Sequence, residues 1–196
     1  MTGLILASAS PRRRQLLEQL AVDFRTLTSP IDEKSLSLTG SPRQQVMTSA
    51  EAKAMAVARL APGSWVLAAD TVVWVEGEIL GKPVDRADGA RMLEKLSGRR
   101  HQVLTGLCLC RQGEEQEMLP ACEETAVWMR KLEQPTIEAY LDTGEPMDKA
   151  GAYGIQGFGG CLIQRIEGCY FNVMGLPLYR TSLLFDRAGI AYWRSR

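Results

Sequence analysis

The stretch from Gly144 to Gly160 constrains the fold more than any other part of the sequence. It reads GEPMDKAGAYGIQGFGG and holds six glycines in seventeen residues, so its backbone can reach positive φ and can come close to a bound group. Asp148, Lys149, Tyr153 and Gln156 add charge and hydrogen-bonding groups. The segment is therefore a poor core element, and it suits either the wall of a binding site or a solvated loop with turn glycines.

Around this segment, short apolar runs alternate with amphipathic ones, which predicts a mixed α/β fold with both parallel and hairpin-connected strands. We expect a single domain over residues 1–196, with a mixed sheet flanked by helices and a central cleft between two lobes. Strands are predicted over 4–7, 23–29, 65–69, 72–75, 78–80, 101–110, 122–130, 161–166 and 169–173. Helices are predicted over 11–20, 42–61, 86–97, 135–143 and 177–188.

The balance of charge argues against a protein that coats nucleic acid. Lysine and arginine together number 23, as do aspartate and glutamate, whereas such affinity needs a basic face that neutralises many phosphates. The N-terminal MTGLILASAS lacks a basic n-region, and no apolar run reaches the length of a membrane span. We therefore expect a cytoplasmic protein with no nucleic-acid partner and no membrane.

Cysteine and histidine usage excludes several kinds of site. The five cysteines are odd in number and lack paired CxxC spacing, so neither a disulfide framework nor a zinc site is indicated. Cys108 and Cys110 share one face of a predicted strand and are expected in the core. His101 is the one histidine, which excludes a multi-histidine metal site and argues against a Ser-His-Asp or Cys-His mechanism.

A basic turn opens the first predicted helix. Ser10 suits the N-cap and Pro11 the first helical position, and Arg12, Arg13 and Arg14 then crowd the first turn. Cations at this positive end of a helix cost about 0.3–1 kcal/mol each where they are exposed. The cluster predicts either an anion bound at the helix terminus or a solvated basic turn.

Lys53 and Asp70 stand out beside apolar segments. Lys53 lies next to the apolar stripe of its predicted helix, so it either extends outward to solvent or points into a cleft. Asp70 follows the apolar run 65–69, and strand ends line the crevices in which α/β proteins bind their ligands. Asp70 can also cap a turn, although no helical pattern follows Thr71.

The charged side chains of these segments suit a polyphosphate. Arginine binds phosphate through two hydrogen bonds, lysine acts as a point charge, and carboxylates hold a divalent cation that screens the phosphate charge. No GxxxxGK[ST] loop is present in the sequence, so a P-loop nucleotide hydrolase is not supported. The candidates are Arg12, Arg13, Lys53, Lys82, Lys149, Glu33, Asp70, Asp148 and Gln156.

Specific blocks of sequence run in order along nearly the whole chain: SASPRRR, AADTVV, GEILGKP, LSGRRHQVLTG, GEPMDKAGAYGIQG and GLPL. In this order they resemble the Maf family of nucleotide pyrophosphatases. The resemblance implies an elongated mixed α/β fold like that of the inosine triphosphate pyrophosphatases, a deep cleft between two lobes, and a homodimer. It also implies hydrolysis of a nucleoside triphosphate to the monophosphate and pyrophosphate.

Three positions resemble the subgroup of this family that acts on dTTP and UTP, namely Arg12 in SPRR, Thr71 after Asp70, and Gln156 in AGAYGIQG. The subgroup that acts on 7-methyl-GTP looks different at all three. An amide suits uracil or thymine, because its donor and acceptor can face the ring N3–H and a carbonyl together. The resemblance therefore implies a pyrimidine nucleoside triphosphate as substrate, either dTTP, UTP or a modified pyrimidine nucleotide.

We expect Asp70 to be the catalytic residue, which either activates a water for attack on the α-phosphorus or chiefly binds metal. Glu33 is the second expected metal ligand, and the expected cofactor is Mg²⁺, Mn²⁺ or Co²⁺. A house-cleaning role and an influence on cell division are further expectations, and the alternative is a non-catalytic nucleotide-binding regulator of cell division. The residues expected to bind substrate are Arg12, Arg13, Lys53, Thr71, Lys82, Lys149 and Gln156.

Overall fold

Strands and helices alternate along most of the chain. The computed structural model describes residues 3–32, 35–113 and 116–193. Its strands are β1 (Leu4–Leu6), β2 (Phe24–Thr26), β3 (Trp65–Val75), β4 (Glu78–Leu80), β5 (Arg100–Gln112), β6 (Gln116–Met129) and β7 (Ile163–Glu167). Its helices are α1 (Pro11–Glu18), α2 (Pro42–Leu60), α3 (Arg86–Leu96), α4 (Gln134–Asp142), α5 (Tyr170–Met174) and α6 (Leu178–Ala188). The short 3-10 helices η2 (Glu145–Asp148), η3 (Ala150–Ala152) and η4 (Gly157–Leu162) follow α4.

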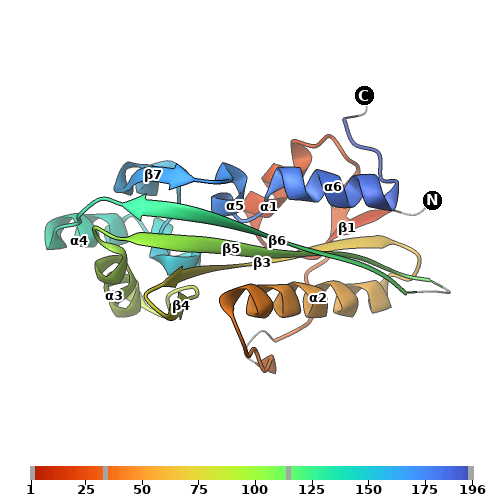
Figure 1. Cartoon of the computed structure of the whole chain (residues 1–196), viewed down its shortest axis with the longest axis horizontal. Coiled ribbons are helices and arrows are strands. Elements are labelled where there is room, and N and C mark those ends of the chain that lie inside the picture. Colours follow the sequence, from red (N-terminus) through yellow and green to blue (C-terminus); the bar gives the residue numbers. More distant parts are fainter. Residues whose placement is uncertain (1–2, 33–34, 114–115, 194–196) are drawn as a thin grey trace. The chain divides into compact units, whose positions relative to one another are not determined.

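One mixed sheet joins the strands (Figure 1). Within the described ranges it has seven strands in the order β2-β1-β3-β5-β6-β7, with β4 paired to β3. β1 runs parallel to both β2 and β3, whereas the β3–β4 and β6–β7 pairs are antiparallel. The predicted mixed α/β fold, with its parallel and hairpin-connected strands, is confirmed.

The chain divides into two compact units, and β3, β5 and β6 each contribute to both. Unit 1 comprises Met1–Asp70, Thr105–Glu123 and Gly175–Arg196, and unit 2 comprises Thr71–Leu104 and Glu124–Met174. The single domain and the cleft between its lobes stay predictions.

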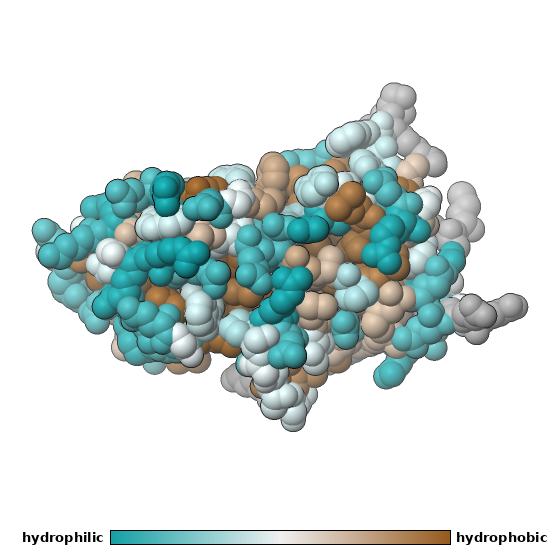
Figure 2. Space-filling view, viewed as in Figure 1, coloured by the Kyte–Doolittle hydropathy of each residue, from teal (hydrophilic) through white to brown (hydrophobic). Residues whose placement is uncertain are grey.

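Across the described residues, no helix combines the length and apolar character that a membrane crossing requires. The face shown in Figure 2 mixes hydrophilic with apolar residues.

In unit 1, α2 begins where the sequence predicts it. The Ser41 hydroxyl oxygen accepts a hydrogen bond from the Gln44 N–H at 3.3 Å, and the Gln44 side-chain oxygen accepts one from the Ser41 N–H at 2.8 Å. This reciprocal pair satisfies backbone donors that the first turn of a helix leaves without partners. Pro42 then takes a position where its missing N–H costs nothing.

Close packing of α2 against β1, β3 and β5 forms one core cluster of unit 1. A Cβ atom on Gly106 of β5 would lie only 2.3 Å from the Val46 carbonyl oxygen of α2, so only glycine permits this helix and strand to approach so closely. The predicted core positions of Cys108 and Cys110 are confirmed. The buried members of the cluster are Ile5, Ala7, Ala50, Ala54, Val57, Ala58, Ala61, Val66, Ala68, Cys108 and Cys110.

Unit 2 has its own core, to which the glycine-rich segment contributes. Ala152 and Tyr153 are 0% and 5% exposed and pack with residues of α3 and α4. Gly151, at φ 70°, turns the chain next to Val73, where a Cβ would lie 2.9 Å from the valine side chain. The expectation that the segment is a poor core element is therefore wrong for this part, because glycine lets its apolar residues fold inward.

β3 is one continuous strand, whereas the sequence predicted two separate strands over 65–69 and 72–75. It spans Trp65–Val75 and passes through Asp70 and Thr71 without a break. Aspartate is uncommon in the interior of a strand. Here Lys53 Nζ lies 2.7 Å from the Asp70 carboxylate and compensates its charge. The β-branched Thr71 also favours strand geometry. The prediction that Asp70 marks the end of a strand is therefore wrong. The contact that lets the strand continue through Asp70 comes from Lys53 on α2, which the local sequence does not reveal.

The run 169–173 contributes to a short helix, not to the second strand of a hairpin. β7 pairs with β6 instead, and α5 occupies Tyr170–Met174. Asn172 is fully buried, and its Nδ2 donates to the Val103 carbonyl at 2.9 Å and to the Thr125 hydroxyl at 3.0 Å. Tyrosine, phenylalanine and valine favour strands by propensity, so the predicted hairpin is wrong because these tertiary contacts prevail.

His101 is buried in unit 2. It is 2% exposed, its Nε2 lies 2.7 Å from the Tyr153 hydroxyl oxygen, and the two rings meet edge to face at 5.3 Å. Burial lowers the pKa of His101 to about 4, because the low-dielectric interior disfavours the imidazolium. The same burial raises the pKa of Tyr153. The imidazole is therefore neutral in the folded protein at physiological pH.

We expect the free energy of unfolding to fall as the pH is lowered from about 7.5 to about 4. The unfolded chain takes up a proton near pH 6.5 and the folded chain only near pH 4, so stability is lost as the pH falls through this window, by about 2 kcal/mol at pH 5. The loss levels off once both states are protonated. Because the chain has one histidine, an NMR titration of its imidazole measures the pKa of His101 in the folded protein without ambiguity. A midpoint above about pH 6 in the folded protein would contradict the prediction.

Candidate functional site

Lys53 and Asp70 form an ion pair in unit 1. Lys53 Nζ donates to Asp70 Oδ1 at 2.7 Å, and the two side chains are only 7% and 16% exposed. Because side chains alternate along a strand, Asp70 shares a face of β3 with Val66 and Ala68, which pack against α2. The lysine therefore turns inward toward the strand, which excludes the solvent-directed orientation that the sequence left open.

The ion pair leaves part of the carboxylate available for chemistry. Oδ1 is held by Lys53, and Oδ2 receives no hydrogen bond from the residues that the structure describes. A carboxylate that is fixed at one oxygen and accessible at the other can accept a proton from water or bind a cation. Both roles predicted for Asp70 are therefore chemically open to it.

Arg12 and Arg13 lie half-buried in the first turn of α1. The Ser10 hydroxyl oxygen caps this helix and accepts from the Arg13 N–H at 3.4 Å, which confirms the predicted cap. Arg13 Nε also donates to the Gly175 carbonyl oxygen at 2.9 Å, and Arg14 pairs with a glutamate four residues on. The positive charge is thus partly balanced inside unit 1, and anion binding at this turn stays a prediction.

Thr71, Lys82 and Gln156 belong to unit 2. Thr71 follows Asp70 along β3, so its side chain faces the opposite side of the strand. Lys82 is exposed in the loop after β4, and Gln156 is exposed immediately before η4. An exposed ammonium and an exposed amide retain their hydrogen-bonding capacity for a ligand.

Lys149, also in unit 2, is held within the glycine-rich segment. Its Nζ donates to the Glu145 carbonyl oxygen at 2.6 Å and to Asp148 Oδ1 at 2.7 Å, and its side chain is 14% exposed. An ammonium has three N–H donors, and these contacts occupy two of them. A phosphate contact for Lys149 stays a prediction, and it would use the third donor or replace Asp148.

Of the two expected metal ligands, Asp70 alone lies within the described residues. Glu33 lies outside the described residues. Among the residues that are described, no group of three or more His, Cys, Asp or Glu side chains lies close enough to hold a metal. Asp70 offers a carboxylate oxygen, and Mg²⁺ commonly binds one or two carboxylates and completes its shell with water and substrate phosphates. The donor set therefore suits Mg²⁺, Mn²⁺ or Co²⁺ bound together with a triphosphate.

Tyr140 and Glu145 were not among the residues that the sequence singled out, yet the structure places them against the loop that carries Gln156. Tyr140, from α4, accepts a hydrogen bond from the Gly154 N–H before Gln156, and Glu145, from η2, accepts from the Phe158 and Gly159 N–H groups after it. Glu145 is the second residue of the block GEPMDKAGAYGIQG, and an acidic side chain beside a segment with many glycine N–H groups is the one signal that points to it.

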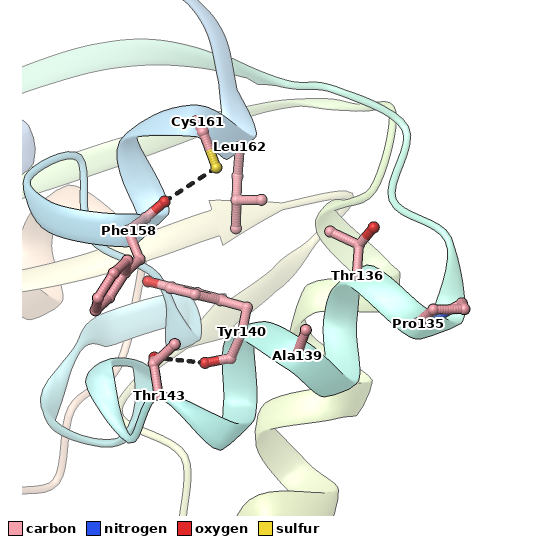
Figure 3. A pocket seen from close by; sticks show the side chains of 8 residues that line it. All are labelled: Pro135, Thr136, Ala139, Tyr140, Thr143, Phe158, Cys161 and Leu162. Atoms are coloured by element: carbon pink, nitrogen blue, oxygen red, sulfur yellow. Dashed lines mark hydrogen bonds between the residues drawn. The ribbon is translucent and has the colours of Figure 1, made fainter.

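A pocket of about 410 Å³ in unit 2 is lined by Tyr140 (Figure 3). Tyr140 and Phe158 lie close together at one end of it, and none of the predicted site residues lines it. A triphosphate needs cationic partners, so this largely apolar pocket does not suit one. Its lining consists of Pro135, Thr136, Ala139, Tyr140, Thr143, Phe158, Cys161 and Leu162.

Several known proteins resemble this chain along nearly its whole length. A family model described as "Maf-like protein" matches residues 3–188. A dTTP/UTP pyrophosphatase of Symbiobacterium thermophilum is 51% identical over 189 residues, which cover 96% of this chain and 95% of that protein. A dTTP/UTP pyrophosphatase of a Geobacillus strain, WCH70, is 49% identical, with coverage of 96% and 100%. Among solved structures, the Ham1 protein of Staphylococcus aureus aligns with a TM-score of 0.49 at 19% identity and covers 83% of this chain and 80% of its own.

Proposed function

Because this chain belongs to the Maf family, we propose that it hydrolyses dTTP and UTP to the nucleoside monophosphate and pyrophosphate. The observation that carries the proposal is about half identity, over nearly the full length, to relatives named dTTP/UTP pyrophosphatases. The buried contact between Lys53 and Asp70 supports it, because a carboxylate held in place can activate a water. Gln156 supports the choice of base, since it is an exposed amide on a glycine-rich loop.

In the proposed reaction, Asp70 takes a proton from a water that attacks the α-phosphorus. A bond forms between the water oxygen and the α-phosphorus, and the bond from the α-phosphorus to the oxygen bridging the β-phosphate breaks and releases pyrophosphate. Lys53 fixes Oδ1 of the carboxylate, so that Oδ2 can receive the proton. A divalent cation would screen the phosphate charge, with Glu33 as its proposed protein ligand, and with Asp70 as a second ligand in the alternative in which this carboxylate chiefly binds metal. The other groups proposed to hold phosphate are Arg12, Arg13, Lys82 and Lys149.

Pyrophosphate release across a panel of canonical and modified nucleotides tests this function. We expect the highest kcat/KM for dTTP, UTP or a modified pyrimidine nucleotide, and turnover that depends on added Mg²⁺, Mn²⁺ or Co²⁺. Tight nucleotide binding without pyrophosphate release from any member of the panel would instead favour the non-catalytic regulator of cell division. Size-exclusion chromatography with light scattering tests the homodimer that we propose from the family resemblance.

Gln156→Glu is expected to lower kcat/KM for dTTP and UTP by about 10- to 100-fold, the range expected for losing a two-point contact with a base edge. A carboxylate cannot donate to a pyrimidine carbonyl, whereas the amide can. The inhibition constant of pyrophosphate should stay nearly constant, because it depends on the phosphate contacts alone. The matched control is Gln164→Glu, the same change at an exposed position of β7. Unchanged kcat/KM ratios across the nucleotide panel would count against a base-reading role for Gln156.

A further inference from the structure

The loop that carries Gln156 is closed by contacts between its own ends. A Cβ on Gly159 would lie 2.3 Å from the Gly154 carbonyl oxygen, and one on Gly160 would lie 2.9 Å from the Ile155 carbonyl oxygen. The two sides of this loop therefore touch backbone to backbone, and a side chain larger than that of glycine at position 159 or 160 would prevent this approach. Gln156 lies between these contacts and is exposed.

Two side chains from outside the loop hold its backbone on both sides of Gln156. On one side, the Gly154 N–H donates to the Tyr140 hydroxyl oxygen at 3.1 Å. On the other side, the Phe158 N–H donates to Glu145 Oε2 at 2.8 Å, and the Gly159 N–H donates to Oε1 at 3.0 Å. Three backbone groups within three residues of Gln156 are thus fixed by two side chains.

Tyr140 and Glu145 are also joined to each other. The Tyr140 hydroxyl donates to Glu145 Oε1 at 2.8 Å, so one hydroxyl links the two sides of the loop. The Glu145 N–H donates to the Thr143 hydroxyl oxygen at 3.1 Å, and that hydroxyl donates to the Tyr140 carbonyl at 2.6 Å. Figure 3 shows the Thr143–Tyr140 contact and the Tyr140 ring beside Phe158. The loop is therefore anchored to the end of α4.

The glycines of the loop make these contacts possible. Gly157 has φ 68°, and a Cβ there would lie 2.4 Å from Glu145 Oε2. A Cβ on Gly159 would lie 2.4 Å from the Tyr140 hydroxyl oxygen. These residues are glycine because Glu145 and Tyr140 approach the backbone so closely, and a role for the glycines in the approach of a ligand stays a prediction.

The Glu145 contacts require an ionised carboxylate. Burial acts to raise the pKa of Glu145, but hydrogen bonds from the Gly159 and Phe158 N–H groups and from Tyr140, with the charge of Lys149, outweigh it and hold the pKa below its usual value. A carboxylate presents acceptors only, and here it meets three donors. A glutamine would turn an NH₂ group toward at least one of these donors, which would break that contact.

We propose that Glu145, acting with Tyr140, is a positioning residue that fixes the loop so that Gln156 can read the nucleobase. The inference rests on the proposed function, because it assigns Glu145 to the selectivity of that same reaction. A side chain on an unanchored loop would have to be ordered during binding, and that cost would reduce the preference for one base over another. Glu145 should therefore affect substrates through their base and leave the chemistry at the phosphates unchanged.

The test compares dTTP with ribose 5-triphosphate, which carries the phosphates without a base. We expect Glu145→Gln to lower kcat/KM for dTTP by about 10- to 100-fold, chiefly through KM, and to leave kcat/KM for ribose 5-triphosphate unchanged. Tyr140→Phe should act in the same direction. The control is Glu138→Gln, which removes the same charge from a partly exposed position on α4 and should change kcat/KM for neither substrate. Thermal melts establish that each variant is folded.

A double-mutant cycle separates positioning from a general structural effect. In a Gln156→Ala background, Glu145→Gln should not lower kcat/KM for dTTP any further, since no amide remains to be positioned. The inference would be overturned if Glu145→Gln lowered kcat/KM equally for dTTP and ribose 5-triphosphate. It would also be overturned if the loss in kcat/KM for dTTP added to that of Gln156→Ala. In both cases the proposed function would stand. A wild-type protein that releases no pyrophosphate from dTTP or UTP would overturn the proposed function, and this inference with it.

Discussion

Asp70→Asn is expected to lower kcat for dTTP by about 10²–10³-fold or more, while nucleotide binding survives. Asparagine keeps the shape of aspartate and can still accept the hydrogen bond that Lys53 Nζ donates at 2.7 Å, so the packing between α2 and β3 should persist. The amide cannot take a proton from water at neutral pH, and general-base assistance is lost. Pyrophosphate release measures the turnover, and isothermal titration with dTTP measures the binding.

The matched control for Asp70→Asn is Asp186→Asn, the same change at an exposed position of α6 in unit 1, which should leave turnover intact. Near-normal pyrophosphate release by Asp70→Asn would remove Asp70 from the catalytic role. A variant that regains activity at high Mg²⁺ or Mn²⁺ concentration would show that Asp70 chiefly binds metal, because a lost base is not restored by mass action.

Lys53→Met is expected to lower the free energy of unfolding by about 3 kcal/mol. The lysine side chain is 7% exposed and the Asp70 side chain 16%, so methionine would fill the volume but leave a largely buried carboxylate without its ammonium. Removing one partner of a buried pair costs far more than the pair contributes, because the remaining charge has lost both water and counter-charge. Urea unfolding monitored by circular dichroism measures the change.

Two comparisons sharpen the Lys53 prediction. Lys95→Met breaks a more exposed pair with Glu78 in unit 2 and should cost less than about 1 kcal/mol. Lys53→Met combined with Asp70→Asn should be more stable than Lys53→Met alone, since the second change neutralises the stranded carboxylate. A Lys53→Met variant as stable as Lys95→Met would mean that the buried pair carries no such penalty.

Much of the fold is predictable because its signals are local. Ser41 and Asp85 cap their helices through atoms only three residues away, and Gly189 ends α6 at φ 67°. Each signal joins neighbours in the chain, so the residue types alone indicate the structure. The predictions for 65–75 and 169–173 failed where the deciding contact, at Lys53 or at Asn172, comes from another element.

The candidate site is predictable as a set of residue types but not as an arrangement. Lys53 and Asp70 could each be singled out from the sequence, yet their contact joins α2 to β3 across 17 positions. Glu145 is indicated only weakly, as an acid beside a glycine-rich segment, because its partners are the backbone N–H groups of Phe158 and Gly159, and every residue except proline carries the same group. Its importance lies in where the chain folds back, which residue types do not reveal.

The contacts around Gln156 separate the presentation of this side chain from its identity. Tyr140 and Glu145 satisfy the loop backbone without using the Gln156 side chain, which is exposed. Replacement of that side chain therefore leaves the anchoring contacts intact and should change stability little, whereas replacement of Tyr140 or Glu145 would loosen the presentation of whatever residue stands there. Under the proposed role of Gln156, a single substitution at this tolerant position would change the preferred base, whereas a substitution at the loop glycines or their anchors would disturb the loop itself.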